Sequence, residues 1–301
     1  IVSNSAITQN GLRGMFLARG MALEVSGSDV SNNSNDGIFV EDFASSGVAP
    51  VITITDSTVT GNSGRGFFHF GKGNVDSSLT ITGSTFEGNG NRAISAEAVP
   101  GSSTVLYNLA RNFVRDGSNN AESAIIAFTA GEGSVIEANL VDGGAVCVAT
   151  NLGSLALHNN TLVNASGAAV DVFDGGGLAI DIRNNIMAQS GDGVASGSGN
   201  GLGATTIDYN LTDVAGVAYD PAFTLGANNI DGLAAGFVSA SATVGAGDYH
   251  LGVGSPARNA GDPGVVLASD IEGNPYAAAP DMGAYSATGG GSSVSDWSVL
   301  E

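Results

Sequence analysis

The chain has 301 residues, of which 43% are hydrophobic and 46 are glycine, a composition that excludes the disordered class. The 29 Asp and Glu residues against 9 Lys and Arg residues give a formal charge of −20, a field that repels nucleic acid. No apolar run approaches the roughly 20 residues of a membrane-spanning helix, so direct membrane insertion of this segment is excluded too.

The clearest predicted elements lie in a stretch that repeats itself, residues 51–62 and residues 79–89. Each copy carries two apolar residues at i and i+2, a small polar residue, one more apolar residue and then Gly-Asn. Alternation with period two that ends in a turn signal predicts a short strand with one buried face. Because a unit this small does not cover that face alone, its tandem repetition predicts stacked coils.

An apolar residue that closely follows a Ser or Asn marks the repeat along the chain, about every 26 residues. The markers are Ile7, Val30, Val59, Phe86, Phe113, Leu140, Leu162, Ile186 and Leu211. The polar residues before them are expected to stack in a column along the axis and to bond to backbone and to one another. They are Ser28, Ser57, Ser84, Asn112, Asn139, Asn160, Asn185 and Asn210.

Each unit then reaches Gly or Ala and a second alternating strand. Parallel stacking predicts a buried file of side chains and an outward file beside it. The buried file is Ile38, Phe67, Ile94, Ile125, Val146 and Val170, and the outward file is Phe39, Phe68, Ser95, Ile126, Cys147 and Asp171. Helical periodicity is sustained nowhere, so the sequence predicts an all-β chain.

The pattern Leu79-x-Ile81-x-x-Ser84-x-Phe86-x-x-Asn89, followed by Ala-Ile, resembles the repeats of the pectin-lyase-like superfamily. The resemblance covers about residues 1–215 and implies a right-handed single-stranded parallel β-helix, a β-solenoid, of about eight or nine coils. Residues 216–288 are then expected to form less regular coils and a cap of the same domain. Residues 289–301 are expected to be a Gly/Ser-rich linker or an added tail.

The tail motifs at residues 248–262, 269–275 and 280–285 resemble the closing segment of bacterial β-helix proteins described as choice-of-anchor. Such a segment usually has a basic residue after Gly-Asn-Pro, where this chain has Tyr276. The resemblance implies an exported bacterial protein that is extracellular or attached to the cell surface, with its anchor beyond Glu301.

Charged side chains recur six residues beyond several markers, at Asp36, Arg65, Arg92 and Asp192. The first three are expected on consecutive coils, about 4.8 Å apart. Arginine pairs hold a sugar carboxylate bidentately, and exposed aromatic side chains offer stacking faces for sugar rings. The predicted ligand-binding residues on this outward face are Asp36, Glu41, Arg65, Phe68, Phe70, Arg92, Glu97 and Phe128. The alternative is that the arginines only form exposed ion pairs at the turns.

A catalytic hypothesis assigns Arg65 and Arg92 to substrate binding in a polysaccharide lyase, with His69 or Lys72 as the base. His69 falls at a core-facing position, which favours a packed histidine. The motif strings of polygalacturonases, pectate lyases and alginate epimerases do not occur.

Four carboxylates near the C-terminus, Asp262, Asp270, Glu272 and Asp281, are candidate oxygen ligands for Ca²⁺. Their spacing does not match a dedicated calcium loop, and a turn is the favoured use. No other cofactor is indicated.

The leading hypothesis is an extracellular or cell-surface β-helix module that binds a polysaccharide or cell-surface glycan, or is adhesive, without catalysis. One alternative is a lyase or epimerase acting on an acidic glycan. A second is a structural subunit of a filament or spike that self-associates through Phe68, Phe70 and Phe128.

Overall fold

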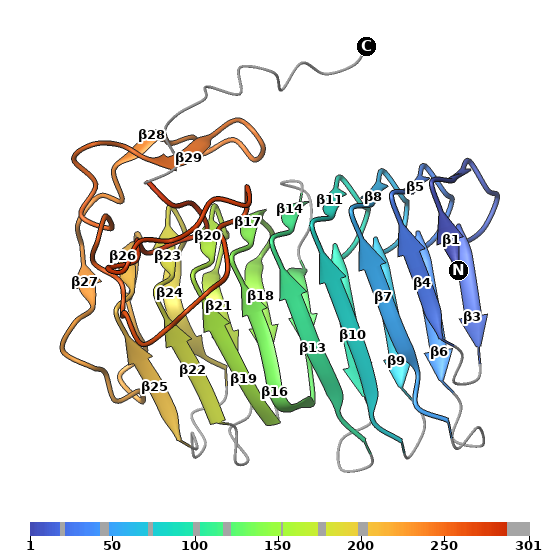
Figure 1. The fold of residues 1–301 in the computed structure, drawn as a ribbon, viewed down its shortest axis with the longest axis horizontal. Helices are drawn as coiled ribbons and strands as arrows, with labels where there is room; N and C mark the ends of the chain where they lie inside the picture. The colour runs from blue at the N-terminus through green and yellow to red at the C-terminus, as the bar shows by residue number, and fades with distance from the viewer. Residues whose placement is uncertain are drawn as a thin grey trace.

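The computed structural model describes residues 1–18, 22–42, 48–71, 75–98, 103–116, 122–151, 153–173, 179–197 and 204–287. These residues form strands, turns and bends, with no α-helix among them and so no helix long and apolar enough to cross a membrane. The coils are stacked along the long axis and form three parallel sheets, A, B and C, that run along it, and successive strands of the chain enter the sheets in that order (Figure 1). The predicted all-β parallel β-helix is confirmed.

The three sheets hold nine, ten and eight strands, against the eight or nine coils expected. Sheet A contains β1 (Val2–Ser3), β4 (Leu23–Ser26), β7 (Val51–Thr55), β10 (Ser77–Thr82), β13 (Val105–Ala110), β16 (Ala130–Glu137), β19 (Gly153–His158), β22 (Ala179–Arg183) and β25 (Thr205–Asp208). Sheet B contains β2 (Ala6–Thr8), β5 (Asp29–Ser31), β8 (Thr58–Thr60), β11 (Thr85–Glu87), β14 (Phe113–Asp116), β17 (Leu140–Gly143), β20 (Thr161–Val163), β23 (Ile186–Ala188), β26 (Leu211–Asp213) and β27 (Ile230–Asp231). Sheet C contains β3 (Met15–Ala18), β6 (Ile38–Asp42), β9 (Phe67–Gly71), β12 (Ile94–Ala98), β15 (Ser123–Ala127), β18 (Val146–Thr150), β21 (Ala168–Val172) and β24 (Asp192–Ser196).

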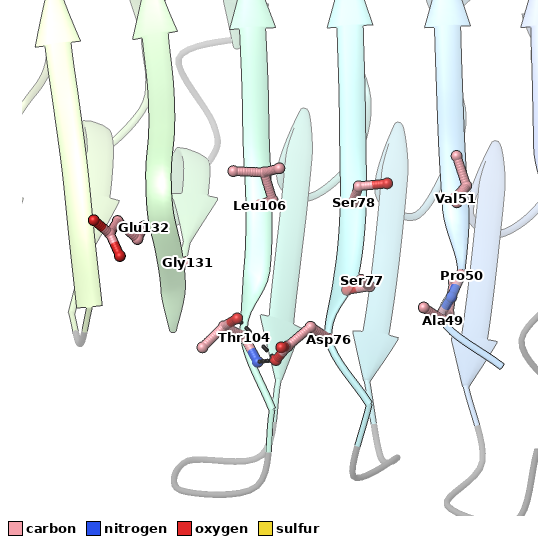
Figure 2. A pocket seen from close by; sticks show the side chains of 10 residues that line it. All are labelled: Ala49, Pro50, Val51, Asp76, Ser77, Ser78, Thr104, Leu106, Gly131 and Glu132. Atoms are coloured by element: carbon pink, nitrogen blue, oxygen red, sulfur yellow. Dashed lines mark hydrogen bonds between the residues drawn. The ribbon is translucent and has the colours of Figure 1, made fainter. Parts of the chain in front are cut away.

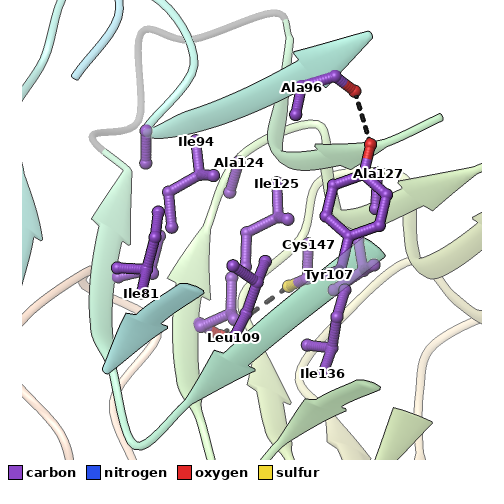
Figure 3. Close-up of a cluster of buried hydrophobic side chains, with 14 of the residues drawn as sticks. Ile81, Ile94, Ala96, Tyr107, Leu109, Ala124, Ile125, Ala127, Ile136 and Cys147 are labelled. Carbon is purple, nitrogen blue, oxygen red and sulfur yellow. Dashed lines mark hydrogen bonds between the residues drawn. The ribbon is translucent and has the colours of Figure 1, made fainter. Parts of the chain in front are cut away.

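The core runs along the axis between the three sheets, because alternate residues of every strand turn inward. Figure 3 shows one section of it, where Ile81, Leu109 and Ile136 of sheet A approach Ile94 and Ile125 of sheet C. These side chains are at most 1% exposed.

Tyr107 lies in the same section and is fully buried. Its hydroxyl oxygen is 2.8 Å from the carbonyl oxygen of Ala96 and 2.7 Å from that of Phe128, so the polar end of the ring is satisfied (Figure 3).

In sheet C the predicted inward file is confirmed in every coil but one. Ile38, Phe67, Ile94, Ile125 and Val170 share it, whereas Val148 takes the place predicted for Val146. Cys147, predicted to face outward, is instead buried in the core, with its Sγ atom 3.5 Å from the carbonyl oxygen of Val163. The cause is local: Gly143 and Gly144 both have positive φ and make a tight turn, so β18 begins two residues earlier than the repeat predicts.

In sheet B the marker residues do not all share one file. The inward file is Ile7, Val30, Val59, Phe86, Val114, Val141, Leu162 and Met187. The predicted markers Phe113, Leu140, Ile186 and Leu211 lie one position earlier, in the outward file that contains Thr85 and Thr161. The marker pattern aligns them with the inward residues because they are apolar, and they are apolar because another part of the chain covers them.

That part is residues 232–287, which we call the C-terminal segment. It packs on the outer face of the later strands of sheet B, and its only strands are the antiparallel pair β28 (Phe237–Ser239) and β29 (Asp248–Leu251) among its described residues (Figure 1). Together the segment and the sheet form a second core, which includes Leu140, Val163, Ile186, Ala188, Leu211, Ala235, Tyr249, Leu251, Ala257, Ile271, Met282, Ala284 and Tyr285.

The predicted polar column is confirmed at the corner between sheets A and B. Each backbone N–H donates to the side chain one coil further on, as from Ser57 to Ser84 at 3.2 Å and from Asn139 to Asn160 at 3.0 Å. The asparagine side chains also donate to backbone carbonyls of the preceding coil, as from Asn185 to the oxygen of Leu157 at 2.8 Å. The column therefore satisfies backbone groups at a corner where the sheets are interrupted.

Candidate functional site on the outer face of sheet C

The first coils of sheet C carry an aromatic row on their outer face, formed by Phe16, Phe39, Phe68 and Phe70. The strand register pairs Phe16 with Phe39 and Phe39 with Phe68, so parallel stacking places their rings one above another. The ring centroids are 5.4 and 5.0 Å apart, with interplanar angles of 19° and 22°, and Phe70 lies 5.9 Å from Phe68.

This stacking changes what the row offers to a ligand. The rings face one another along the axis, so the expected strip of free stacking faces is not present at Phe39, which is only 6% exposed. Phe16 stands at the end of the row and is 53% exposed. A sugar ring would therefore meet ring edges along the row and one open ring at its end.

Two arginines lie against these rings. The guanidinium carbon of Arg65 is 3.8 Å from the ring centroid of Phe68, and that of Arg13 is 4.3 Å from the centroid of Phe39. Asp36 lies between them: its Oδ2 atom is 3.2 Å from Nε of Arg13, and its Oδ1 atom accepts the backbone N–H of Arg65 at 2.9 Å. Cation–π contact thus fixes both guanidinium groups at the edge of the aromatic row.

Asp36, Arg65 and Arg92 occupy three consecutive coils, as predicted from their equal offsets. The N–H of Gly37 donates to the carbonyl of Arg65, and the N–H of Gly66 donates to that of Arg92. Arg92 is held in ion pairs, with Glu97 at 3.2 Å and with Glu122 at 2.6 Å. The file Glu41, Phe70 and Glu97 is also present, so the two glutamates are separated by one coil.

Arg65 differs from Arg92 in that no ion pair or side-chain hydrogen bond holds it within the part of the chain that the structure describes. Its Nε atom is buried and has no hydrogen-bond partner. Burial lowers the pKa of Arg65, and the nearby charge of Arg92 lowers it further. Arg65 is therefore the arginine on this face that forms no ion pair with a described carboxylate, although the Nε atom of Arg92 is also buried without a partner.

The candidate base His69 is not on this face. His69 has no exposed surface, both of its ring nitrogens are buried without partners, and burial lowers its pKa to about 4. It is a neutral core residue at neutral pH, beneath the sheet that carries Arg65. Lys72 lies outside the described residues.

Phe128 does not join the aromatic row. Its ring packs edge-on against Phe173, with centroids 6.3 Å apart and an interplanar angle of 72°, further along sheet C.

The four calcium candidates each hold protein groups instead. Asp270, fully buried, accepts the backbone N–H groups of Glu272, Asn274 and Ser286. Asp281 accepts those of Asn259 and Ala287, and Glu272 pairs with His250. Asp262 lies 2.8 Å from Arg183. Across the described ranges there is no group of three or more His, Cys, Asp or Glu side chains that could hold a metal ion, and these aspartates serve turns.

Two residues of this face were missed in the sequence. Arg13 stands six residues beyond Ile7, the same offset that identified Asp36, Arg65 and Arg92. Asp171 was placed on the outward file without a role, and its Oδ1 atom is buried with no hydrogen-bond partner. Burial raises the pKa of Asp171.

Comparison with known proteins agrees with the fold. A family model described as a right handed beta helix region matches residues 1–110. Among solved structures, the crystal structure of pectate lyase Pel9A is similar to the chain at 15% sequence identity, covering 93% of this chain and 72% of that one with a TM-score of 0.44. No curated protein sequence matches the chain. The fold is a right-handed parallel β-helix.

Proposed function

We propose that the protein is an extracellular β-helix module that binds a carboxylate-bearing glycan, without catalysis, on the outer face of the first coils of sheet C. The observation that carries the proposal is Arg65, whose guanidinium carbon lies 3.8 Å from the ring centroid of Phe68 and which forms no ion pair with a described carboxylate. A planar guanidinium group with unused donors can form two parallel hydrogen bonds to the carboxylate of a sugar. The resemblance of the tail to choice-of-anchor segments supports an exported, surface-attached location.

The neighbouring groups suit binding better than chemistry. Glu97 already accepts from Arg92 and from the hydroxyl of Ser95, and the imidazole of His69 is sealed in the core. Glu41 and Glu97 are two coil spacings apart, about 10 Å, with the ring of Phe70 between them. Phe16 and Arg13 extend the face toward the first coil.

The alternative is eliminative cleavage, for which Arg65 and Arg92 lie on adjacent coils of this face. In that case the two guanidinium groups would hold the substrate carboxylate, because an arginine stays protonated near neutral pH. The two hypotheses are separated by incubating the protein with uronic-acid polysaccharides and following the ultraviolet absorbance of unsaturated product. Glycan binding with no absorbance change supports the module, and steady product formation overturns it in favour of the lyase.

The binding face is tested by calorimetric titration with uronic-acid oligosaccharides and with neutral oligosaccharides of the same length. Arg65→Ala is expected to weaken uronate binding about 10- to 100-fold, because it removes a charge-assisted hydrogen-bond pair. Arg65→Lys should give a uronate affinity between those of the wild type and Arg65→Ala, since lysine keeps the positive charge but cannot form the two parallel hydrogen bonds of a guanidinium group. Arg258→Ala removes an equal charge from the C-terminal segment and serves as the control. Unchanged uronate affinity in Arg65→Ala overturns the proposal.

A further inference from the structure

A second surface feature lies away from the aromatic row, on the outer face of sheet A. It is an open groove of about 370 Å³ that crosses four consecutive strands, β7, β10, β13 and β16, near their starts (Figure 2). Its described lining is Ala49, Pro50, Val51, Asp76, Ser77, Ser78, Thr104, Leu106, Gly131 and Glu132.

The strand register organises this lining into files. Val51, Ser78 and Leu106 pair with one another across β7, β10 and β13 and form one side of the groove, as Figure 2 shows. Val51 is 50% exposed and Leu106 is 43% exposed, which is unusual on a sheet face otherwise rich in threonine. The groove therefore exposes two aliphatic side chains, Val51 and Leu106, on either side of Ser78.

An irregularity in β16 closes one end. The register between β13 and β16 shifts after Val105, so extra residues of β16 bulge outward, and Gly133 there has a φ of +84°. The bulge is stabilised by Ser134, whose hydroxyl donates to the carbonyl of Gly131 at 2.7 Å and accepts the N–H of Tyr107 at 3.1 Å. It places Glu132 at the end of the groove, exposed and two coils beyond Asp76.

No ion pair joins Asp76 or Glu132 to a cation among the described residues. Asp76 uses its Oδ1 atom to accept the N–H and the hydroxyl of Thr104, at 2.8 and 2.9 Å, and its Oδ2 atom has no donor in the described part of the chain. Glu132 has no hydrogen bond or ion pair with any described residue. No arginine or lysine is among the described lining residues. Two coil spacings put the carboxylates about 10 Å apart along the axis.

We propose that this groove binds a linear aliphatic polyamine, with one ammonium group at Asp76, another at Glu132, and the methylene chain between them over Leu106. Two carboxylates this far apart do not converge on a single metal ion, whereas an extended dication reaches both. The described lining residues include no aromatic ring for a sugar to stack on, and an anionic chain is repelled. The overall charge of −20 raises the concentration of cations near the surface.

The test is a calorimetric or NMR titration of the intact protein with α,ω-diamines of increasing length and with spermidine. Affinity is expected to pass through a maximum at the chain length that spans both carboxylates, and the corresponding diols should not bind. Glu132→Gln and Asp76→Asn are each expected to weaken the best diamine about 3- to 5-fold, as for an exposed ion pair. Leu106→Ser should weaken long diamines more than short ones.

Two controls separate this site from diffuse attraction to an acidic protein. Asp29→Asn removes an exposed carboxylate from sheet B, outside the groove, and should leave the affinity unchanged. Glu132 is exposed, so its replacement does not threaten folding, and thermal melting confirms that Asp76→Asn still folds. Affinity that is independent of diamine length, or that falls equally in Asp29→Asn and Glu132→Gln, overturns the proposal.

Discussion

The outer face of sheet B has two halves that share one backbone register and differ in what covers them. In the first four strands, β2, β5, β8 and β11, the outward residues include Thr58, Thr60 and Thr85 and are mostly exposed to solvent. In β14 to β26 the same file carries Phe113, Leu140, Ile186 and Leu211, and the C-terminal segment lies over it. One position in the repeat is therefore surface in one half of the molecule and core in the other.

The polar column changes at the same boundary. It is built from Ser28, Ser57 and Ser84 in the first half and from asparagine from Asn112 onward. The longer asparagine side chain also donates to carbonyl groups of the preceding coil, whereas the serine hydroxyls donate to the residue two positions earlier. The second half thus has a second core, and the first half has an asparagine column of its own at the corner between sheets B and C, as from Asn33 to Asn62.

The largest expected difference between the halves is the loss of stability when a side chain of the shared file is truncated. Ile186→Ala is expected to lower the free energy of unfolding by about 2–5 kcal/mol, because Ile186 is fully buried beneath the C-terminal segment. Thr58→Ala, in the same file of the first half, should change it by less than about 0.5 kcal/mol. Urea denaturation of both variants provides the measurement. Equal costs at the two positions would show that the C-terminal segment does not cover the sheet.

Sequence alone predicted the stacked coils, the polar column and most of the inward file of sheet C, since these follow from period-two alternation and equal spacing. It placed Leu140 and Ile186 in the wrong file, because an apolar outward residue looks like a core residue until its cover is known. Cys147 was misplaced by a turn with two glycines in the left-handed region, whose length the repeat does not reveal.

The candidate site was only partly predictable. Equal offsets brought Asp36, Arg65 and Arg92 together correctly, since parallel stacking turns equal offsets into neighbours. The offsets do not tell which arginine is neutralised, because Glu122 reaches Arg92 from another coil. Equal offsets also do not reveal that the phenylalanine rings stack on one another, because that depends on the side-chain rotamers.

A pH-dependent difference between the halves is expected from His69, in the core of the first half. Its file continues in later coils as Ala96, Ala127 and Thr150. Burial holds the pKa of His69 at about 4, so the unfolded chain takes up a proton below about pH 6.5 and the folded protein does not until near pH 4. Stability is lost as the pH falls through that window, by about 3 kcal/mol in full.

His69→Leu removes this dependence, and its stability relative to the wild type should rise by about 3 kcal/mol between pH 7 and pH 4. Hydrogen exchange followed by mass spectrometry should show that acid opens the coils around β9 before those around β21 in the wild type. A stability difference that stays constant with pH would mean that the pKa of His69 is the same in the folded and unfolded states.

The polar column provides a smaller contrast. Asn185→Ala removes the acceptor of the Asn160 N–H and the donor to the Leu157 carbonyl, leaving buried groups unpaired at a cost of about 2 kcal/mol. Ser57→Ala removes fewer bonds, those to the N–H of Ser28 and the carbonyl of Thr55, and should cost about 1 kcal/mol. Thermal unfolding of both variants measures the difference. A greater loss in Ser57→Ala would contradict the larger role assigned to the asparagines.

The smallest expected effect concerns the edge where the C-terminal segment meets sheet A. Asp262 accepts the N–H of Gly264 at 2.8 Å and pairs with Arg183 of β22, also at 2.8 Å, and these contacts lower its pKa, the Gly264 bond first. These contacts stabilise the folded protein at pH values above the usual pKa of a carboxyl group, and the stabilisation is lost as the pH falls through the lowered pKa of Asp262. Because the pair is partly exposed, Asp262→Asn should cost only about 0–1 kcal/mol.

The loss in Asp262→Asn should nevertheless be local, because a contact at the edge of the C-terminal segment controls opening of that segment more than unfolding of the coils. Hydrogen exchange at residues 248–264 is expected to accelerate about 2- to 5-fold while exchange in the strands of sheet A stays unchanged. Equal acceleration in both would mean that the C-terminal segment and the coils unfold as one cooperative unit, and the two halves of sheet B would then differ in composition without differing in independent stability.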